Sequence, residues 1–278
     1  MSLEIKTLLI LKFTMKKTFF CYLDVLGFKE KLKDKSDSEQ VDILNSLFGY
    51  ISFSIPGNST NQQDQAKSLI NLDSINTSSI LISDSILLWT NDCEYKNTIE
   101  FIYRIQRLIK NAFMGGFPLR GTIEYGSLYH IEKSIPTKTS YNHFDVIGGS
   151  ALMDAFIEEQ KLEWLGCTLS KTCLAEIKRI VKDYDQSDDS YSNELFKNKI
   201  LVEYEVPKKS GVVEKYFTIN WVDFIVTGYY KKQEIKDIFL KYTDLSNLAW
   251  PVKIKIDNTN ENLKYIIENN WGNQYTAS

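Results

Sequence analysis

The sequence is poor in the residues that build metal–thiolate sites and disulfide frameworks. It has only two histidines, His130 and His143, and four cysteines with no CxxC spacing. A structural zinc site needs a cluster of such residues, and a small disulfide-stapled domain needs many closely spaced cysteines. The composition therefore argues against a zinc protein. It indicates reduced cysteines that pack in the interior of a cytoplasmic protein.

Long hydrophobic runs and an excess of charge are also missing. The apolar run near the N-terminus covers only residues 8–11 and ends at Lys12, which is too short for a signal sequence or a membrane span. The 33 lysines and arginines nearly balance the 36 aspartates and glutamates, for a net charge of −3. Such a balance does not favour bulk binding to nucleic acid or acidic membrane. We therefore expect neither as a partner.

The chain does have enough apolar residues for a large core. Hydrophobic residues make up 43% of 278 positions, as is typical of globular domains. We predict a leader at 1–17, either disordered or upstream of the natural start, then one main domain at 18–222. A mainly helical C-terminal extension follows at 223–278. Polar stretches at 55–67 and 183–194 are expected to be loops.

The hydrophobic period switches repeatedly between that of a strand and that of a helix. Strands are predicted at 18–26, in a hairpin over 69–90 with its turn at 76–77, and at 118–131, 198–206 and 214–222. Helices are predicted at 38–53, 97–113, 149–163 and 172–183. This order indicates an α+β fold in which one antiparallel sheet is covered by helices in the ferredoxin-like manner.

Two aspartates stand at the ends of predicted strands. Asp24 in YLDVLGF precedes a glycine turn, and Asp84 in ISDSILLW lies in the hairpin. The predicted sheet brings them together. Either acid alone could simply cap a turn, but two converging carboxylates bind hard divalent cations. The turn Leu26-Gly27-Phe28 can point backbone N–H groups at phosphate oxygens. Together these features are typical of phosphoryl transfer assisted by two cations.

The order of the motifs resembles that of the class III nucleotidyl cyclases, the adenylate and guanylate cyclase family. DVLGF with Asp24 and SDS with Asp84 are similar to the two metal-binding segments of that family. Further similar segments follow in the same order: LRGTIEYG (119–126), FDVIGGSALMDAF (144–156), LGCTLSKTCL (165–174) and EVPKKSGVVEKY (205–216). The resemblance covers roughly residues 18–222, which would form the catalytic domain.

The resemblance implies a set of roles for these residues. Asp24 and Asp84 would bind two Mn²⁺ or Mg²⁺ ions, and the turn at 26–28 would contact substrate. Asp145 would contact the base, and Lys208 or Lys209 would contact the triphosphate. Arg120 is the candidate for the positive group at the transition state. Because active sites of this family lie between protomers, a single catalytic domain implies a homodimer.

Three positions depart from the family pattern. Leu152 and Phe156 stand where the family has an asparagine and an arginine, and Ile80 replaces a lysine that reads purines. This combination resembles the pyrimidine cyclases of bacterial Pycsar antiphage systems, with UTP favoured and CTP an alternative. An acid such as Asp145 accepts a hydrogen bond from either base. Two other interpretations stay open: an adenylate or guanylate cyclase, and an inactive cyclase-fold protein that binds a nucleotide or a partner.

Overall fold

The computed structural model describes residues 10–55, 76–136, 141–185, 194–222 and 250–269. Its strands are β1 (Ile10–Val25), β2 (Thr77–Ile82), β3 (Ser85–Thr90), β4 (Leu119–Pro136), β5 (Tyr141–Gly148), β6 (Gly166–Leu169), β7 (Leu201–Pro207) and β8 (Val213–Ile219). Its helices are α1 (Phe28–Leu32), α2 (Asp37–Ser54), α3 (Tyr95–Met114), α4 (Ser150–Lys161), α5 (Lys171–Asp185), α6 (Glu194–Lys197) and α9 (Trp250–Glu268).

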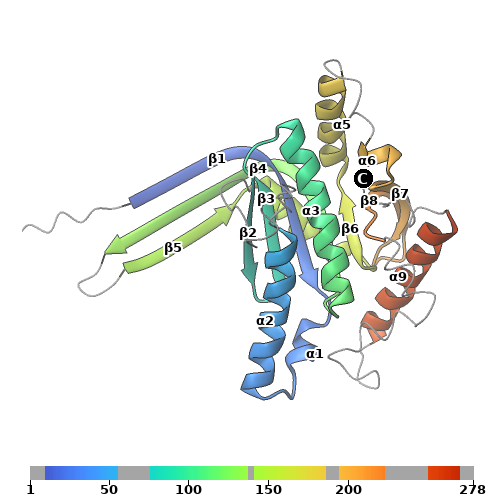
Figure 1. Ribbon diagram of the computed structural model, residues 1–278, viewed down its shortest axis with the longest axis horizontal. Coiled ribbons are helices and arrows are strands. Elements are labelled where there is room, and N and C mark those ends of the chain that lie inside the picture. Colours follow the sequence, from blue (N-terminus) through green and yellow to red (C-terminus); the bar gives the residue numbers. More distant parts are fainter. Residues whose placement is uncertain (1–9, 56–75, 137–140, 186–193, 223–249, 270–278) are drawn as a thin grey trace, which may run out of the picture.

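The described strands form one eight-stranded sheet in the order β2-β3-β1-β4-β6-β8-β7, and β5 pairs with β4 (Figure 1). The predicted α+β class, a sheet covered by helices, is confirmed. The sheet is not purely antiparallel, however, because β6 runs parallel to β4. A parallel neighbour needs a crossover connection, and the segment from β5 through α4 supplies it.

The strands β1 and β4 are much longer than the sequence predicts. They pair without interruption from Ile10 opposite Ser134 to Val25 opposite Leu119. With β5 they form an arm that projects from the body of the protein in Figure 1. Residues 10–17, predicted as part of a leader, therefore belong to β1. Their lysines obscured the strand pattern, but pairing with β4 satisfies their backbone hydrogen-bonding groups.

Side chains of β1 alternate between two apolar clusters, as the period of a strand requires. Phe19, Cys21 and Leu23 face the main core, which they share with residues of α2, α3, α5 and α9. Phe20 and Tyr22 face the opposite side of the sheet, where α4 covers them with its small residues Ala151 and Ala155. The four cysteines are free thiols, three of them buried, as predicted.

The hairpin turn lies seven residues beyond its predicted position. The strands β2 and β3 are joined by Ser83 and Asp84, not by residues 76–77. The apolar segments 80–82 and 86–89 on both sides of the short polar stretch Ser83-Asp84-Ser85 concealed the turn. Ser83 adopts a left-handed φ of 57°, which tight two-residue hairpins require and which few non-glycine residues adopt.

The described part of the C-terminal extension is not a separate appendage. Helix α9 places Ile256, Leu263 and Ile266 in the main core. Residues 223–249 lie outside the described residues, as do most of the two predicted loops, although α5 continues to Asp185. None of the helices within the described ranges has the length and apolar character to cross a membrane.

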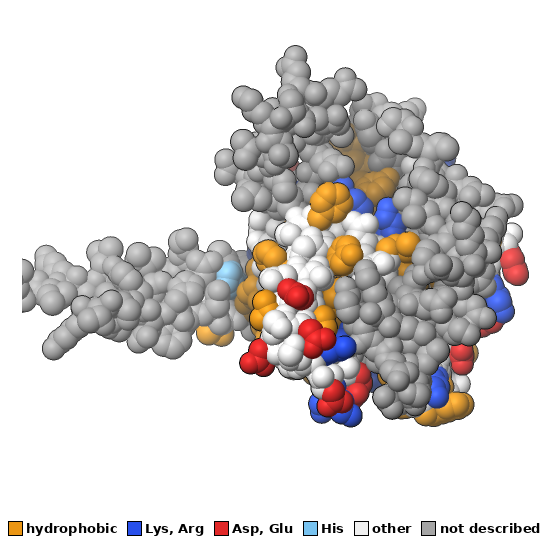
Figure 2. All heavy atoms as spheres, turned by 60° about the horizontal axis from the view of Figure 1, so that its bottom comes forward, with side chains coloured by type: hydrophobic (Ala, Val, Ile, Leu, Met, Phe, Trp, Pro, Cys, Tyr) orange, Lys and Arg blue, Asp and Glu red, His pale blue; other side chains and the backbone are white. Residues whose placement is uncertain are grey.

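One face of the molecule shows charges of both signs side by side. Figure 2 brings the lower end of Figure 1 forward, and acidic and basic side chains lie interspersed there with single hydrophobic side chains. The exposed hydrophobic residues on α2 are Val41, Leu44, Phe48 and Phe53. Among the side chains described on this face, no broad patch of one sign forms. This agrees with the nearly balanced charge of the sequence.

Candidate functional site

The structure brings the two predicted acidic segments together. Asp24 lies opposite Ser85 in the β1–β3 register. The N–H of Val25 donates to the carbonyl oxygen of Asp84 at 2.9 Å. The acids, sixty residues apart in the chain, are thus held at adjacent positions by backbone pairing. Asp84 can lie beside Asp24 because it is one of the two residues of the β2–β3 turn.

The alternation of β1 decides which face Asp24 occupies. Asp24 follows Tyr22 by two residues, so both lie on the α4 side of the sheet. The hydroxyl of Tyr22 lies 2.7 Å from Oγ of Ser85. Asp24 retains 24% exposure of its side chain. The acid is therefore partly buried but still reachable from solvent.

Arg120 links Asp24 to a third acid. The strand β4 places Arg120 opposite Asp24, and its Nη2 donates to Oδ2 of Asp24 at 3.4 Å. The same guanidinium forms a much closer ion pair with Glu159 of α4. Its Nη1 donates to the carbonyl oxygen of Leu162 at 3.3 Å. The charge of Arg120 is therefore largely engaged by Glu159, and its contact with Asp24 is the weaker one.

The residue next to Arg120 must be glycine. A Cβ on Gly121 would lie 1.9 Å from the carbonyl oxygen of Tyr22. No side chain fits at that distance, so β1 and β4 approach closely only because this position is bare. Gly121 thus allows β4 to place Arg120 opposite Asp24 on β1.

The surroundings of Asp24 raise its pKa, chiefly through burial. Burial raises the pKa of Asp24 to about 7, and the negative charges of Glu159 and Asp84 act in the same direction. The positive charges of Arg120 and Lys255 oppose the shift. Negative charge is thus incompletely compensated at this point. Binding of a cation would relieve it.

The acids at this site can supply only some of the ligands that a hard divalent cation needs. Within the described ranges, no group of three or more His, Cys, Asp or Glu side chains is placed to hold a metal ion. Asp24 and Asp84 supply two carboxylates, and Mg²⁺ is commonly held by one or two carboxylates together with water and substrate phosphates. The chemistry of these two acids therefore fits such a cation, with the remaining ligands coming from elsewhere.

The raised pKa predicts an effect of Asp24 on stability in the presence of a chelator. The folded protein retains a proton on Asp24 up to about pH 7, whereas an unfolded aspartate loses it near pH 3.9. The stability of the wild type should therefore fall as pH rises through this window. Asp24→Asn should be more stable than the wild type by roughly 1–3 kcal/mol at pH 8, after allowance for partial exposure. Urea unfolding at pH 4 and pH 8 measures the difference, and an equal difference at both values would contradict the assignment.

The glycine turn has its predicted conformation, but one of its N–H groups is occupied. Gly27 has a left-handed φ of 67° and precedes the first residue of α1, Phe28. The N–H of Leu26 donates to the carbonyl oxygen of Pro118 at 2.9 Å. Contrary to the sequence prediction, Leu26 cannot offer this group to a phosphate. The first N–H groups of α1 have no partner within the helix and remain candidates.

The two predicted triphosphate lysines lie at the tip between β7 and β8. Lys208 is buried, and its Nζ pairs with Glu158 and donates to the hydroxyl of Tyr216 at 2.7 Å. The N–H of Lys209 donates to the carbonyl oxygen of Lys161 at 2.9 Å. The tip is thus docked on the end of α4 and is not a freely solvated loop. The ammonium group of Lys208 is neutralised within the protein.

Asp145 is far from the acid pair within the same chain. Its backbone pairs with Glu132 in the β4–β5 arm, and its side chain lies outside the described part. Glu132 is twelve residues along β4 from Arg120, which corresponds to about 40 Å of strand. In Figure 1 the arm that contains this part of β4 and β5 projects away from the body. One chain alone does not bring the predicted base contact and the predicted metal ligands together.

The three positions that depart from the family pattern lie around the small apolar cluster under α4. Ile80 and Leu152 pack against that cluster, and the ring of Phe156 meets Tyr22 edge-on at 5.6 Å between centroids. Phe156 is still 39% exposed. The face of the sheet next to Asp24 is therefore apolar at these three positions.

Several solved structures are similar in fold to this chain. No model of a protein family and no curated protein matches the sequence. Among solved structures, the guanylyl cyclase Cya2 is 12% identical with a TM-score of 0.42, over 74% of this chain and 92% of that one. The adenylyl cyclase CyaB from P. aeruginosa is 14% identical with a TM-score of 0.41, over 75% and 96%.

A third similar structure is the dimeric guanylyl cyclase domain of the RhoGC fusion protein from the aquatic fungus Blastocladiella emersonii. It is 12% identical with a TM-score of 0.42, over 74% of this chain and 97% of that one. At these scores the likenesses carry no weight for function. The assignment of function depends on the geometry of this chain.

Sequence reasoning missed two residues of the site. Glu159 was hidden in the charged run of α4, and the only signal for it was its spacing, four residues after the small buried Ala155. Lys255 of α9 was missed because nothing in the sequence indicates that the C-terminal helix reaches this region. Both are buried, with 3% and 6% exposure. Buried charged residues are rare unless paired or functional.

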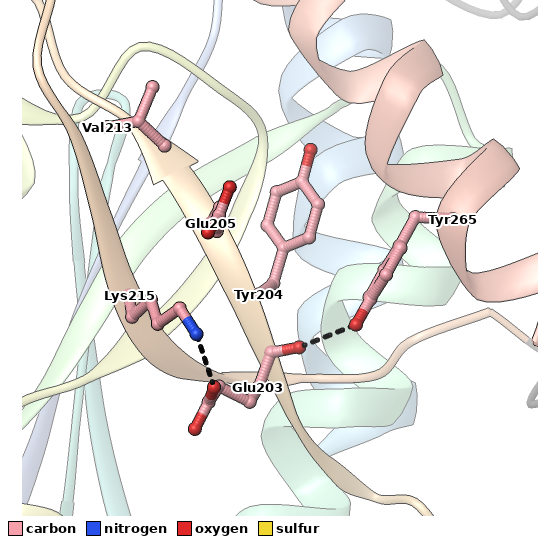
Figure 3. Close-up of a pocket in the computed structure, with 6 residues that line it drawn as sticks. All are labelled: Glu203, Tyr204, Glu205, Val213, Lys215 and Tyr265. Atoms are coloured by element: carbon pink, nitrogen blue, oxygen red, sulfur yellow. Dashed lines mark hydrogen bonds and ion pairs between the residues drawn. The ribbon is translucent and has the colours of Figure 1, made fainter.

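A cavity of about 390 Å³ lies apart from these acids, between the β7–β8 hairpin and α9 (Figure 3). Its lining includes Glu203, Glu205, Tyr204 and Tyr265. The hydroxyl of Tyr265 contacts the carbonyl oxygen of Glu203 at 3.5 Å, and Lys215 pairs with the Glu203 carboxylate at 3.4 Å. None of the predicted site residues lines this cavity. The contacts across it fix α9 to the sheet.

Proposed function

We propose that this protein is a nucleotidyl cyclase of the class III type. The observation that carries the proposal is the close placement of Asp24, near the end of β1, and Asp84, in the β2–β3 turn. The hydrogen bond from Val25 N–H to the carbonyl oxygen of Asp84 fixes it. Such a pair on rigid strands can hold divalent cations over a triphosphate. The resemblance of the sequence motifs to that family supports the same function.

Asp24 and Asp84 would hold two Mg²⁺ or Mn²⁺ ions. When bound, the cations would lower the pKa of the ribose 3′-hydroxyl and compensate charge on the triphosphate. Arg120 would orient the carboxylate of Asp24, because Glu159 already engages most of its charge. This role differs from the transition-state contact expected from the sequence. The glycine turn at 27–28 and Lys209 would approach the phosphates.

The separation of Asp145 from the acid pair supports a homodimer. If both contact one nucleotide, they must come from different copies of the chain, because about 40 Å of strand separates them within one copy. A head-to-tail arrangement of two chains would form two such sites. The arm of β4 and β5 is the element that would reach across to the other copy.

We further propose a pyrimidine nucleoside triphosphate as substrate, with UTP favoured over CTP. Ile80, Leu152 and Phe156 provide no hydrogen-bond donor for the polar edge of a purine, and an unpaired buried polar atom costs about 1–3 kcal/mol. The product would be the 3′,5′-cyclic monophosphate with pyrophosphate. The resemblance to Pycsar cyclases supports a cytoplasmic role in antiphage signalling.

Incubation with each of the four nucleoside triphosphates and Mn²⁺, followed by mass spectrometry, tests these proposals. We expect cyclic UMP as the main product, with less cyclic CMP. Cyclic AMP or cyclic GMP alone would remove the pyrimidine assignment and keep the reaction type. If no nucleotide gives a cyclic product, the result would favour a protein that binds a nucleotide without converting it. The apolar residues Leu152 and Phe156 would then explain the lack of activity.

A further inference from the structure

Lys255 is a buried cation that forms no ion pair with any carboxylate of the described residues. Its side chain is on α9 with 6% exposure, and its Nζ donates to the carbonyl oxygen of Pro251 at 3.2 Å. Among the described residues, no carboxylate oxygen lies within 4 Å of this Nζ, which is the distance limit for an ion pair. Arg120 and Lys208, the other buried cations near the site, are each paired with a glutamate. The nearby charges of Glu163 and Glu159 favour the ammonium form, but burying a charge without a direct ion pair is costly. An anion bound at this Nζ would therefore stabilise it.

Helix α9 is docked on the segment that follows α4. Nδ2 of Asn258 donates to the carbonyl oxygen of Glu163 at 2.6 Å, and Oγ1 of Thr259 accepts from the N–H of Leu165 at 3.0 Å. Lys255 is one helical turn before Thr259, so both lie on the same face of α9. The side chain of Lys255 is therefore on the side of α9 that faces this segment.

The docked segment is in direct contact with Arg120. The carbonyl oxygen of Leu162 accepts a hydrogen bond from the Arg120 guanidinium, and Gly166 pairs with Arg120 in the β4–β6 register. Lys255 thus approaches Asp24 from the β6 side of the sheet, whereas the Asp84 turn lies on the β3 side. The electrostatic influence of Lys255 on Asp24 agrees with this placement.

The C-terminal part of α9 is fixed as well. In Figure 3, Tyr265 reaches from α9 to the carbonyl oxygen of Glu203, and its ring lies 5.4 Å from that of Tyr204. With the middle and the C-terminal part of α9 docked, the position of Lys255 is set by the packing of the helix. A preorganised ammonium group binds an anion without the entropy loss of ordering a long side chain.

We propose that Lys255 binds a phosphate oxyanion of the nucleotide substrate, so that α9 completes the active site. This inference rests on the proposed function. Burial lowers the pKa of Lys255 in the free protein. The positive charges of Arg120 and Lys209 act in the same direction, and the negative charges of Glu163 and Glu159 oppose them. A phosphate group beside Lys255 compensates these positive charges together. The C-terminal helix then contributes to substrate binding and does not only brace the fold.

Binding of inorganic tripolyphosphate to the full chain in the presence of Mn²⁺, measured by calorimetry, tests the inference without requiring turnover. Lys255→Met should bind tripolyphosphate at least about tenfold more weakly than the wild type, as loss of a hydrogen bond to a charged group implies. Lys255→Arg should recover part of the affinity. Lys253→Met, which alters an exposed lysine of the same helix, should bind within about twofold of the wild type.

Thermal unfolding separates a binding role from a structural one. Without ligand, Lys255→Met should be at least as stable as the wild type, because removing an uncompensated buried charge is neutral or favourable. Tripolyphosphate should stabilise the wild type and not this variant. Equal binding by both proteins, or no binding by the wild type, would overturn the inference.

The outcomes for Lys255 and for the proposed function can be distinguished. Binding of tripolyphosphate that depends on Lys255, with no cyclic product from any nucleotide, would support the phosphate site and remove the cyclase. Cyclic product formed by Lys255→Met with an unchanged KM would support the cyclase and overturn the role of Lys255.

Discussion

Replacing Asp24 or Asp84 with asparagine should reduce turnover by at least about 10³-fold. The amide keeps the shape of the side chain but loses the negative charge that would hold a divalent cation. A bound cation supplies several kcal/mol of charge stabilisation in such reactions, and about 4 kcal/mol corresponds to three orders of magnitude in rate. Product formation from the preferred nucleotide, followed by mass spectrometry, measures the loss.

The two variants need a matched control because asparagine could disturb the fold. Asp154→Asn changes an exposed acid of α4 and should keep at least half of the wild-type turnover. Circular dichroism should show native secondary structure in all three variants. Mn²⁺ should raise the thermal stability of the wild type and of Asp154→Asn, but not of Asp24→Asn or Asp84→Asn. Full turnover in either of these two would show that the acid pair is not the metal site.

The sequence predicts the acid pair because backbone pairing alone determines it. An aspartate at the end of an apolar strand and another inside a hairpin must meet if the two strands are neighbours, and the β1–β3 register places them so. The fold class is predictable for the same reason, since strand and helix periods are local properties. The turn at Ser83 was misplaced because its left-handed conformation is imposed by pairing and not signalled by a glycine.

The remaining parts of the site depend on packing between distant elements. Glu159 becomes important only because α4 lies across β4 and meets Arg120. Lys255 depends on how α9 docks on residues 163–165, which no local pattern encodes. The engagement of Lys208 by Glu158 likewise appears only in three dimensions. Sequence motifs thus identify the charged residues, whereas packing decides which charges are already paired.

Replacing Glu159 with alanine should destabilise the protein by about 3–5 kcal/mol, the usual cost of removing one partner of a buried ion pair. The carboxylate of Glu159 is 4% exposed and is the main partner of the Arg120 guanidinium, which is itself 9% exposed. Without it, Arg120 keeps only the Leu162 carbonyl oxygen and the longer contact with Asp24. Urea unfolding measures the change.

Two further variants show whether the loss comes from the unpaired charge. Gln160→Ala alters the neighbouring exposed residue of α4 and should change stability by less than about 0.5 kcal/mol. The double variant Arg120→Met with Glu159→Leu removes both charges and should recover most of the stability, because apolar replacement of a buried pair is often neutral or favourable. It should nevertheless be impaired in turnover, since Asp24 loses the group that orients it. If the double variant is as unstable as Glu159→Ala, the lost stability comes from the packing of α4 and not from the ion pair.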